Sequence, residues 1–147
     1  MKSYKTALLQ GKAYRALEKR LAEALYPYDL VIPEWKLLCL IEDGDDVQPA
    51  HVAELLGVKR PFITVLTERL YDKGLIDRFD HETDKRAHIL AITKKGSQVL
   101  KDCEKNVRHF LNAISRDVSL KDKIVYLHVL NTIIQTDEKL GKEVKQK

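Results

Sequence analysis

The sequence contains no long run of apolar residues, and this absence argues against a membrane span. A transmembrane helix needs about 20 consecutive, mostly apolar residues, whereas charged side chains interrupt the apolar stretches of this chain. The first residues, Met1-Lys2-Ser3-Tyr4-Lys5, lead into an amphipathic pattern and not into the apolar core of a signal peptide. We therefore expect a cytoplasmic protein with no membrane partner.

Cysteine and histidine are too few and too scattered to form a familiar metal site. The two cysteines, Cys39 and Cys103, do not form a Cys-x-x-Cys pair, and the five histidines include no His-x-x-x-His pair. We expect no cofactor and no structural metal, although a regulatory site built from distant residues such as Cys39 and His109 stays open. Apolar or helical surroundings favour two reduced, packed thiols, because a redox sensor needs an exposed thiol of lowered pKa.

The short motifs that mark common enzyme sites are also missing. The sequence has no nucleophile elbow, no phosphate-binding loop, no cluster of metal ligands and no carboxylate pair in a recognisable setting. We therefore predict that the protein is not an enzyme.

Charge is plentiful and unevenly distributed. Hydrophobic residues make up 44% of the 147-residue chain and charged residues 33%, which leaves enough apolar material for a folded core. The formal net charge is +4. Residues 42–54 carry five acidic residues and no Lys or Arg, whereas residues 59–95 carry nine basic against six acidic residues. A basic segment of this kind is compatible with nucleic-acid binding.

Apolar residues recur at helical spacing near the N-terminus. Residues 3–25 carry such a stripe between charged residues, which predicts a long amphipathic helix. This helix ends at Pro27, because proline disfavours helix in the residue before it. Pro33 suits the first turn of a second helix, and the turn residues 43–46 end it.

Two short helices follow, with a glycine between them. The first covers about residues 48–56, and Gly57 suits the left-handed turn that ends it. The second begins at residue 60 or 61, runs to residue 72 or 73 and ends at Gly74. Two short helices joined by a glycine turn predict a helix-turn-helix.

The rest of the chain predicts a β-hairpin and two helices. Residues 75–79 and 88–92 are rich in β-branched or aromatic residues and predict two strands joined by a polar tip. Thr93 is a suitable N-cap for a helix over residues 94–115. Ser119, with an acidic residue three positions later, resembles a capping box that begins a last helix, which runs to about residue 140. The tail beyond it is expected to fray.

The second helix of the pair has one face suited to a core and one suited to DNA. At about 100° per residue, Ile63, Leu66 and Leu70 fall in one sector, so we predict that they are buried. Unobtrusive side chains lie opposite, and such a helix can enter a major groove about 12 Å wide. The residues that we predict to contact DNA, including two cations of the hairpin tip, are Lys59, Arg60, Pro61, Phe62, Thr64, Val65, Arg69, Lys85 and Arg86.

The cations at the two ends of this region have distinct expected roles. Lys59 and Arg60 lie at the helix N-terminus, where backbone N–H groups and the helix dipole favour a phosphate. Arg86, on the hairpin tip, can reach a narrow A·T-rich minor groove, and Asp84 can orient its guanidinium group. Each residue alone could be an ordinary solvated charge, so the order of the elements carries the prediction.

Several stretches resemble the MarR family of multiple antibiotic resistance regulators. Residues 84–93 resemble its wing signature, which reads Asp, any residue, Arg, three residues of any kind, Leu, any residue, an aliphatic residue and Thr. Residues 69–78 resemble the end of its recognition helix and the start of its wing, and residues 52–58 the helix before these. Glu34 and Trp35, with the two leucines that follow, resemble its second helix, so the resemblance covers nearly the whole chain.

The resemblance implies a mainly α fold with a small β wing, a winged helix-turn-helix with N- and C-terminal dimerisation helices. Residues 1–30 and 94–147 would form the dimerisation arm, and residues 31–93 the DNA-binding lobe. It also implies a homodimer on a pseudo-palindromic operator, and the wide apolar stripes of the end helices favour a dimer independently. Two departures affect the DNA contacts: Lys59 replaces a frequent Ser, and Val65 replaces an Arg that would contact guanine or phosphate.

Members of the family often bind a small aromatic or anionic effector between the dimer arm and the DNA lobe. The resemblance implies such a molecule here, with Tyr14, Tyr28 and Trp35 either as lining residues or as plain core residues. We therefore predict a sequence-specific DNA-binding transcription regulator, a homodimeric repressor that responds to a small molecule. The alternative is a winged-helix module that binds protein and not DNA, which the weak net charge and Val65 leave open.

Overall fold

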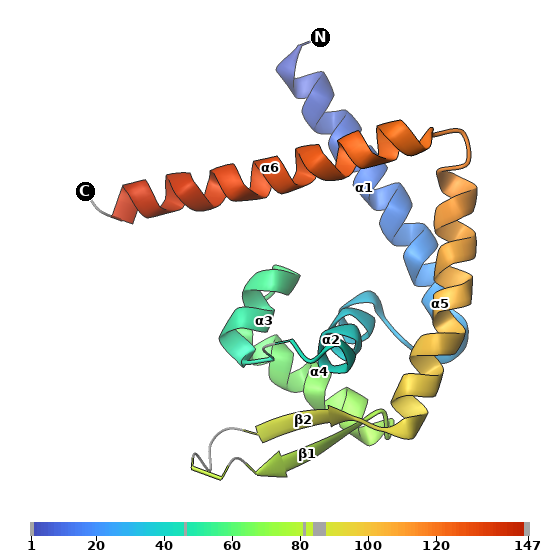
Figure 1. Ribbon diagram of the computed structural model, residues 1–147, viewed down its shortest axis with the longest axis vertical. Helices are drawn as coiled ribbons and strands as arrows, with labels where there is room; N and C mark the ends of the chain where they lie inside the picture. The colour runs from blue at the N-terminus through green and yellow to red at the C-terminus, as the bar shows by residue number, and fades with distance from the viewer. Residues whose placement is uncertain (1, 46, 81, 84–87, 146–147) are drawn as a thin grey trace. The chain divides into compact units, whose positions relative to one another are not determined.

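The computed structural model describes residues 2–45, 47–80, 82–83 and 88–145 (Figure 1). The chain divides into two compact units, Met1–Leu111 and Asn112–Lys147. No helix in the described ranges is both long and apolar enough to cross a membrane. The elements, in chain order, are α1 (Ser3–Leu25), the 3-10 turn η1 (Tyr26–Tyr28), α2 (Ile32–Asp43), α3 (Pro49–Leu56), α4 (Arg60–Asp72), β1 (Ile76–Asp80), β2 (His88–Ile92), α5 (Lys94–Ile114) and α6 (Leu120–Lys145).

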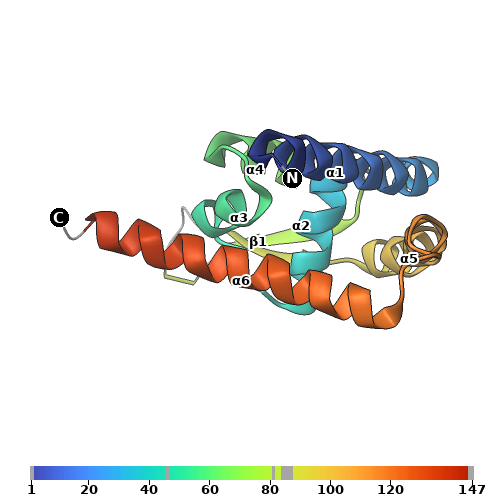
Figure 2. The ribbon, with the colours of Figure 1, turned by 90° about the horizontal axis from the view of Figure 1, so that it is seen from above.

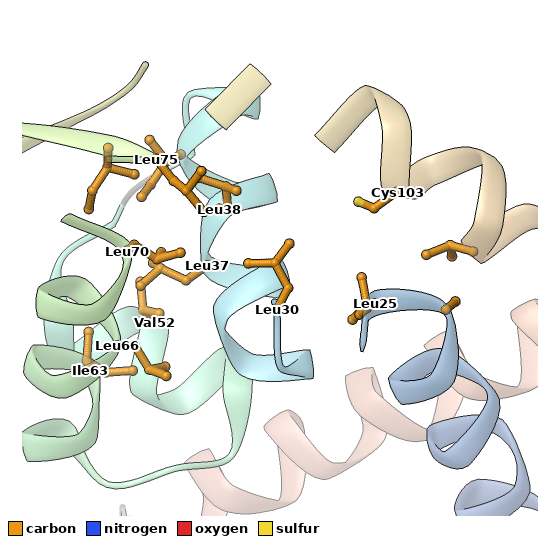
Figure 3. Close-up of a cluster of buried hydrophobic side chains, with 14 of the residues drawn as sticks. Leu25, Leu30, Leu37, Leu38, Val52, Ile63, Leu66, Leu70, Leu75 and Cys103 are labelled. Atoms are coloured by element: carbon orange, nitrogen blue, oxygen red, sulfur yellow. The ribbon is translucent and has the colours of Figure 1, made fainter. Parts of the chain in front are cut away.

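The core of the first unit is centred on α2. In Figure 3, Leu37 and Leu38 of α2 lie between side chains of α4 on one side and Leu25 of α1 and Cys103 of α5 on the other, and all four named side chains have an exposed fraction of 0%. Each fully buried leucine contributes about 1.5–3 kcal/mol relative to an exposed one. Helix α1 lies across α2 (Figure 2). The C-terminal end of α1 is therefore fixed to the lobe that carries the helix-turn-helix.

The helix-turn-helix consists of α3 and α4, as the sequence predicted. Gly57 follows α3 with a φ of 64°, and Gly74 follows α4 with a φ of 69°. Both values lie in the left-handed region, which glycine adopts without a steric penalty because it has no Cβ atom. The backbone N–H of Leu75 then donates to the carbonyl of Leu70 at 2.9 Å, which turns the chain from α4 into the first strand.

The two strands form an antiparallel hairpin. Ile76 pairs with Ile92 and Asp80 with His88, so the ladder is in register over its whole length. Strand β1 begins one residue later than predicted and includes Asp80, because Leu75 is occupied in the turn out of α4. The hairpin packs on the helices through β1 against α4 and β2 against α2.

Helix α5 begins at the predicted N-cap. The hydroxyl of Thr93 accepts a hydrogen bond from the backbone N–H of Gly96 at 3.0 Å and donates to the carbonyl of Gly74 at 2.7 Å. The first unit includes most of α5, because Cys103 and Val107 are buried in its core. Thr93 therefore joins the end of the helix-turn-helix to the start of α5.

The second unit contains α6. The Ser119 hydroxyl accepts from the backbone N–H of Asp122 at 3.1 Å, as the predicted cap requires. The same hydroxyl donates to the Asp122 carboxylate at 2.6 Å, so this side chain bonds the cap hydroxyl and not only the backbone. The prediction that the helix stops near residue 140 is wrong, since α6 continues through Gly141 to Lys145. A glycine costs a helix only about 1 kcal/mol, which the long flanking helix tolerates.

Candidate nucleic-acid interface

Helix α4 presents the two faces that its periodicity predicted. Ile63 is 2% exposed, and Leu66 and Leu70 have no exposed surface. On the opposite side Thr64 and Val65 are exposed, and Val65 retains 42% of its surface. The outward face is therefore available to a partner while the inward face anchors the helix to α2.

The N-terminus of α4 combines two exposed cations with uncapped backbone groups. Lys59 is the N-cap residue and Arg60 the first helical residue, and both side chains are exposed. No side chain caps this helix end within the described residues. Pro61 has no N–H, and the N–H of Phe62 donates to the Lys59 carbonyl at 2.9 Å. The positive end of the helix dipole beside two exposed cations is therefore what suits a phosphate at this end.

The remaining predicted residues of α4 differ in how accessible they are. Pro61 and Arg69 are exposed, the latter in the last turn of the helix. Phe62 is half-buried and packs against the core, so only part of its ring is available for contact. Phe62 thus serves mainly to seat the start of α4 on the lobe.

The cations of the hairpin tip lie outside the described residues. Lys85, Arg86 and Asp84 belong to the segment between β1 and β2 for which the structure gives no description. The strands that lead into and out of this segment are described and packed on α2 and α4. The roles predicted for the three residues stay predictions.

Arg78 links the wing to α4, and sequence reasoning missed this link. Its guanidinium group donates to both carboxylate oxygens of Glu68, and it stacks 4.1 Å above the centre of the Tyr71 ring. The hydrogen bond to Glu68 raises the pKa of Arg78 above its ordinary value. Because ten residues separate Arg78 from Glu68, no helical spacing indicated the pair, and only the hairpin brings the two side chains together.

A second missed contact lies inside the lobe, between α2 and the end of α4. The Lys73 ammonium donates to the Glu34 carboxylate at 2.9 Å, and the side chain of Glu34 is 2% exposed. The ammonium also donates to the backbone carbonyl of Asp29. The same carboxylate oxygen of Glu34 accepts from the Val31 N–H at 3.2 Å, which satisfies one free donor at the start of α2. A buried carboxylate needs such partners. The sequence contains many lysines and arginines, however, and it does not show which of them pairs with Glu34.

A groove of about 640 Å³ opens between α1, α2 and the turn from α3 to α4. Tyr14 lines it, whereas the other two aromatic residues predicted for an effector site lie elsewhere. The hydroxyl of Tyr28 donates to the backbone carbonyl of Asp102 at 3.0 Å, and Trp35 packs against the core. Both residues are partly buried against the core, and their predicted place in an effector site stays a prediction. The lining residues of the groove are Tyr14, Arg15, Glu18, Lys19, Ala22, Tyr26, Leu30, Val31, Ile32, Pro33, Lys36, Leu56 and Val58.

The groove has three cations and one acidic residue. Glu18 accepts a hydrogen bond from the Tyr14 hydroxyl at 2.7 Å, and this bond raises the pKa of Tyr14. The positive charges of Arg15, Lys19 and Lys36 are therefore opposed by one carboxylate that is already engaged. Exposed aromatic rings line the same groove, so it can accept a molecule that is both aromatic and anionic.

Both cysteine thiols have raised pKa values, which favour the protonated, unreactive form. Burial is the largest cause that raises the pKa of Cys39 to about 12 and that of Cys103 to about 11. Neither value fits the exposed, low-pKa thiol that a redox sensor needs. Among the residues that the structure describes, no group of three or more His, Cys, Asp or Glu side chains could hold a metal ion.

Comparison with known proteins identifies relatives of this architecture. Residues 30–88 match the model of the MarR family. The multiple antibiotic resistance protein MarR of Escherichia coli is 28% identical over 90 residues, which span 61% of this chain and 62% of that relative. The match thus covers about three fifths of the curated relative.

Solved structures match over a longer range. A MarR family transcriptional regulator from Rhodococcus sp. RHA1 is 19% identical with a TM-score of 0.80, over 90% of this chain and 94% of the other. A mutant MarR from Escherichia coli, solved in complex with operator DNA, is 20% identical with a TM-score of 0.74, over 90% of this chain and 99% of the other. At these identities the likeness concerns the fold, and it extends beyond the helix-turn-helix to the terminal helices.

Proposed function

The chain belongs to the MarR family through the domain at residues 30–88, and from this premise we propose that it is a homodimeric transcription regulator that binds double-stranded DNA. Its target is a pseudo-palindromic operator, because a two-fold dimer reads two related half-sites about one DNA turn apart. The regulator acts as a repressor that a small molecule releases.

The exposed face of α4 is the observation that carries this proposal. Thr64 and Val65 project from the lobe, and Lys59 and Arg60 lie beside the uncapped end of the helix. Thr64 can hydrogen-bond a base edge or a phosphate, and Val65 can touch a thymine methyl group. The two cations neutralise phosphates and set the register of the helix in the groove.

Exposed apolar side chains on the end helices support the homodimer. Helix α1 exposes three large apolar side chains in its first half, at Tyr4, Leu8 and Leu9. Helix α6 exposes apolar side chains on two opposite faces, and a helix that is apolar on more than one face is normally buried. A second copy can cover these surfaces. The apolar residues of α6 with more than a third of their surface exposed are Leu120, Ile124, Val125, Tyr126, Leu127, Val129, Leu130, Ile133, Ile134 and Leu140.

The groove beside α1 and α2 is the proposed effector site. Its three cations and its exposed tyrosines suit a small aromatic anion. One of its lining residues, Val58, directly precedes Lys59, the N-cap of α4. The occupant would lie beside the start of the recognition helix. The bacterial relatives and the DNA target also lead us to assign the protein to the cytoplasm.

Selection of bound sequences from a random duplex pool is the decisive experiment. We expect a two-fold sequence to be enriched, and its affinity to fall steeply with salt because each neutralised phosphate releases a counterion. Benzoate, a simple aromatic anion, should release the selected duplex. No enriched sequence together with a shallow salt dependence would contradict the proposal.

Two substitutions connect this result to the site. Arg86→Ala should weaken operator binding sharply, whereas Arg108→Ala, which removes the same charge from the exposed surface of α5, should not. Val65→Asp should abolish binding, because it adds a carboxylate to the groove-facing side of α4. A protein-binding module would instead retain a protein partner in all three variants and show no preferred duplex.

A further inference from the structure

Lys73 connects the end of α4 to the segment before α2. Its side chain is 26% exposed, and its ammonium contacts the Glu34 carboxylate at 2.9 Å, the Asp29 carboxylate at 3.5 Å and the Asp29 backbone carbonyl. Asp29 is held with a φ of 53°, in the left-handed region that few non-glycine residues adopt. Two held acceptors, the buried Glu34 carboxylate and the Asp29 backbone carbonyl, therefore bind this cation, while the 91% exposed side chain of Asp29 adds a longer ion pair.

The backbone of Lys73 is held from a different direction. Its carbonyl accepts a hydrogen bond from the Lys95 ammonium at 2.6 Å, and the next carbonyl, of Gly74, accepts from Thr93. The C-terminal end of α4 is thus tied to α5 through backbone acceptors and to α2 through the Lys73 side chain. The N-terminal end of α4 has no comparable polar tie among the described contacts.

Apolar packing fixes the crossing angle of two helices only approximately, because the angles of ridges-into-grooves packing scatter by about 15–20° around their preferred values. Directional hydrogen bonds to a buried carboxylate are more restrictive, since a displaced partner leaves a charge unpaired in the core. Glu34 and Lys73 thus restrict how α4 can tilt on α2. Tilt decides which side chains of α4 reach base edges, whereas phosphate contacts tolerate small movements.

We propose that Lys73 is a positioning residue for DNA recognition: through Glu34 and Asp29 it sets the tilt of α4 and thereby the ability of the protein to discriminate operator from random DNA. This inference rests on the proposed function. It assigns Lys73 no contact with DNA, because its ammonium faces the lobe interior and is occupied there.

The test compares Lys73→Met with Lys101→Met in the full-length protein. Lys101 is an exposed lysine of α5, so the control removes the same charge from a surface position. We measure affinity for the operator selected with the wild-type protein and for random-sequence duplex, each over a range of salt concentrations. Lys73→Met should lower the operator-to-random affinity ratio about tenfold, the order lost when one base contact is misplaced. Its salt slope should equal that of wild type, and Lys101→Met should retain the wild-type ratio.

A double variant separates positioning from simple stability. Lys73→Met combined with Glu34→Met replaces the ion pair by an apolar pair, and such replacements often restore or raise stability. If directional contacts set the tilt, the double variant recovers its thermal midpoint but keeps the lowered affinity ratio. A ratio that follows the thermal midpoint in every variant, or that is unchanged in Lys73→Met, overturns the inference. If the wild-type protein itself prefers no sequence, the proposed function fails and this inference fails with it.

Discussion

At the residue scale, the burial of Cys103 and the partial burial of Cys39 have a consequence for stability. Cys39 and Cys103 titrate near pH 12 and 11 in the folded chain, above the ordinary value of 9.0. In the unfolded chain both thiols lose their protons first as the pH rises. The two protonated thiols therefore contribute fully to the free energy of unfolding below about pH 9, and this contribution is lost as the pH rises through 11 to 12.

We accordingly expect the free energy of unfolding to fall between pH 9 and pH 12 more steeply in the wild type than in the Cys39→Ala/Cys103→Ala variant. Urea unfolding at a series of pH values measures this difference. Equal slopes for the two proteins would show that the thiols are not buried as described.

The same burial predicts low chemical reactivity. At pH 8, iodoacetamide should modify the folded protein at least about tenfold more slowly than the urea-unfolded chain, because only the thiolate is nucleophilic. Mass spectrometry of the two peptides gives the rate for each cysteine. Fast modification of either thiol in the folded protein would reopen a redox-sensing role.

At the element scale, the start of α5 is packed unusually tightly against the turn that follows α4. A Cβ atom added to Gly96 would overlap the backbone oxygen of Leu75 and lie 2.7 Å from a side-chain carbon of Ile92. Neither the turn nor β2 can move without disturbing the hairpin. Gly96 is therefore required by close approach and not by its φ angle.

Gly96→Ala should destabilise the protein by about 1–3 kcal/mol, the usual cost of inserting volume into a packed site. Gly141→Ala is the matched control, because Gly141 lies within α6 and a Cβ there would meet nothing within 4 Å. The control should be neutral or stabilising by up to about 1 kcal/mol. Urea unfolding distinguishes the two, and a neutral Gly96→Ala would contradict the tight contact.

Also at the element scale, glycine and helical periodicity made the helix-turn-helix predictable. Gly57 and Gly74 mark the ends of α3 and α4 because their backbone conformations exclude most other residues. The three-residue core sector of α4 followed from 3.6-residue periodicity. The end of α6 was predicted wrongly, because a glycine in a helix is only a weak terminator when the helix continues on both sides.

At the scale of the whole molecule, α6 carries the strongest indication of an assembly. Its exposed apolar residues form two faces, one of which contains Leu127 and Leu130. The remaining narrow polar strip includes Gln135. Under the proposed function, dimerisation also links two DNA-binding lobes and raises affinity through effective concentration.

Leu127→Glu/Leu130→Glu should convert a dimer into a monomer of 17.0 kDa. Light scattering after size exclusion measures the mass. Operator affinity should fall by at least about 100-fold when the second lobe is lost. Gln135→Glu adds the same type of charge to the polar strip and should leave both properties unchanged. A double variant that remains dimeric would contradict the assignment of this face of α6 to the dimer interface.

The sequence by itself determined the local features: the order of the elements, the helix-turn-helix, the buried sector of α4 and the caps at Thr93 and Ser119. These depend on the backbone preferences of glycine, proline and hydroxyl residues and on helical periodicity, which act within a few residues. It could not predict that, of Tyr14, Tyr28 and Trp35, only Tyr14 lines the groove, whereas the other two pack against the core. The tertiary structure alone decided this, together with the Glu34–Lys73 and Glu68–Arg78 pairs, because a charge or ring has many partners compatible with its sequence position and only the packed fold selects one.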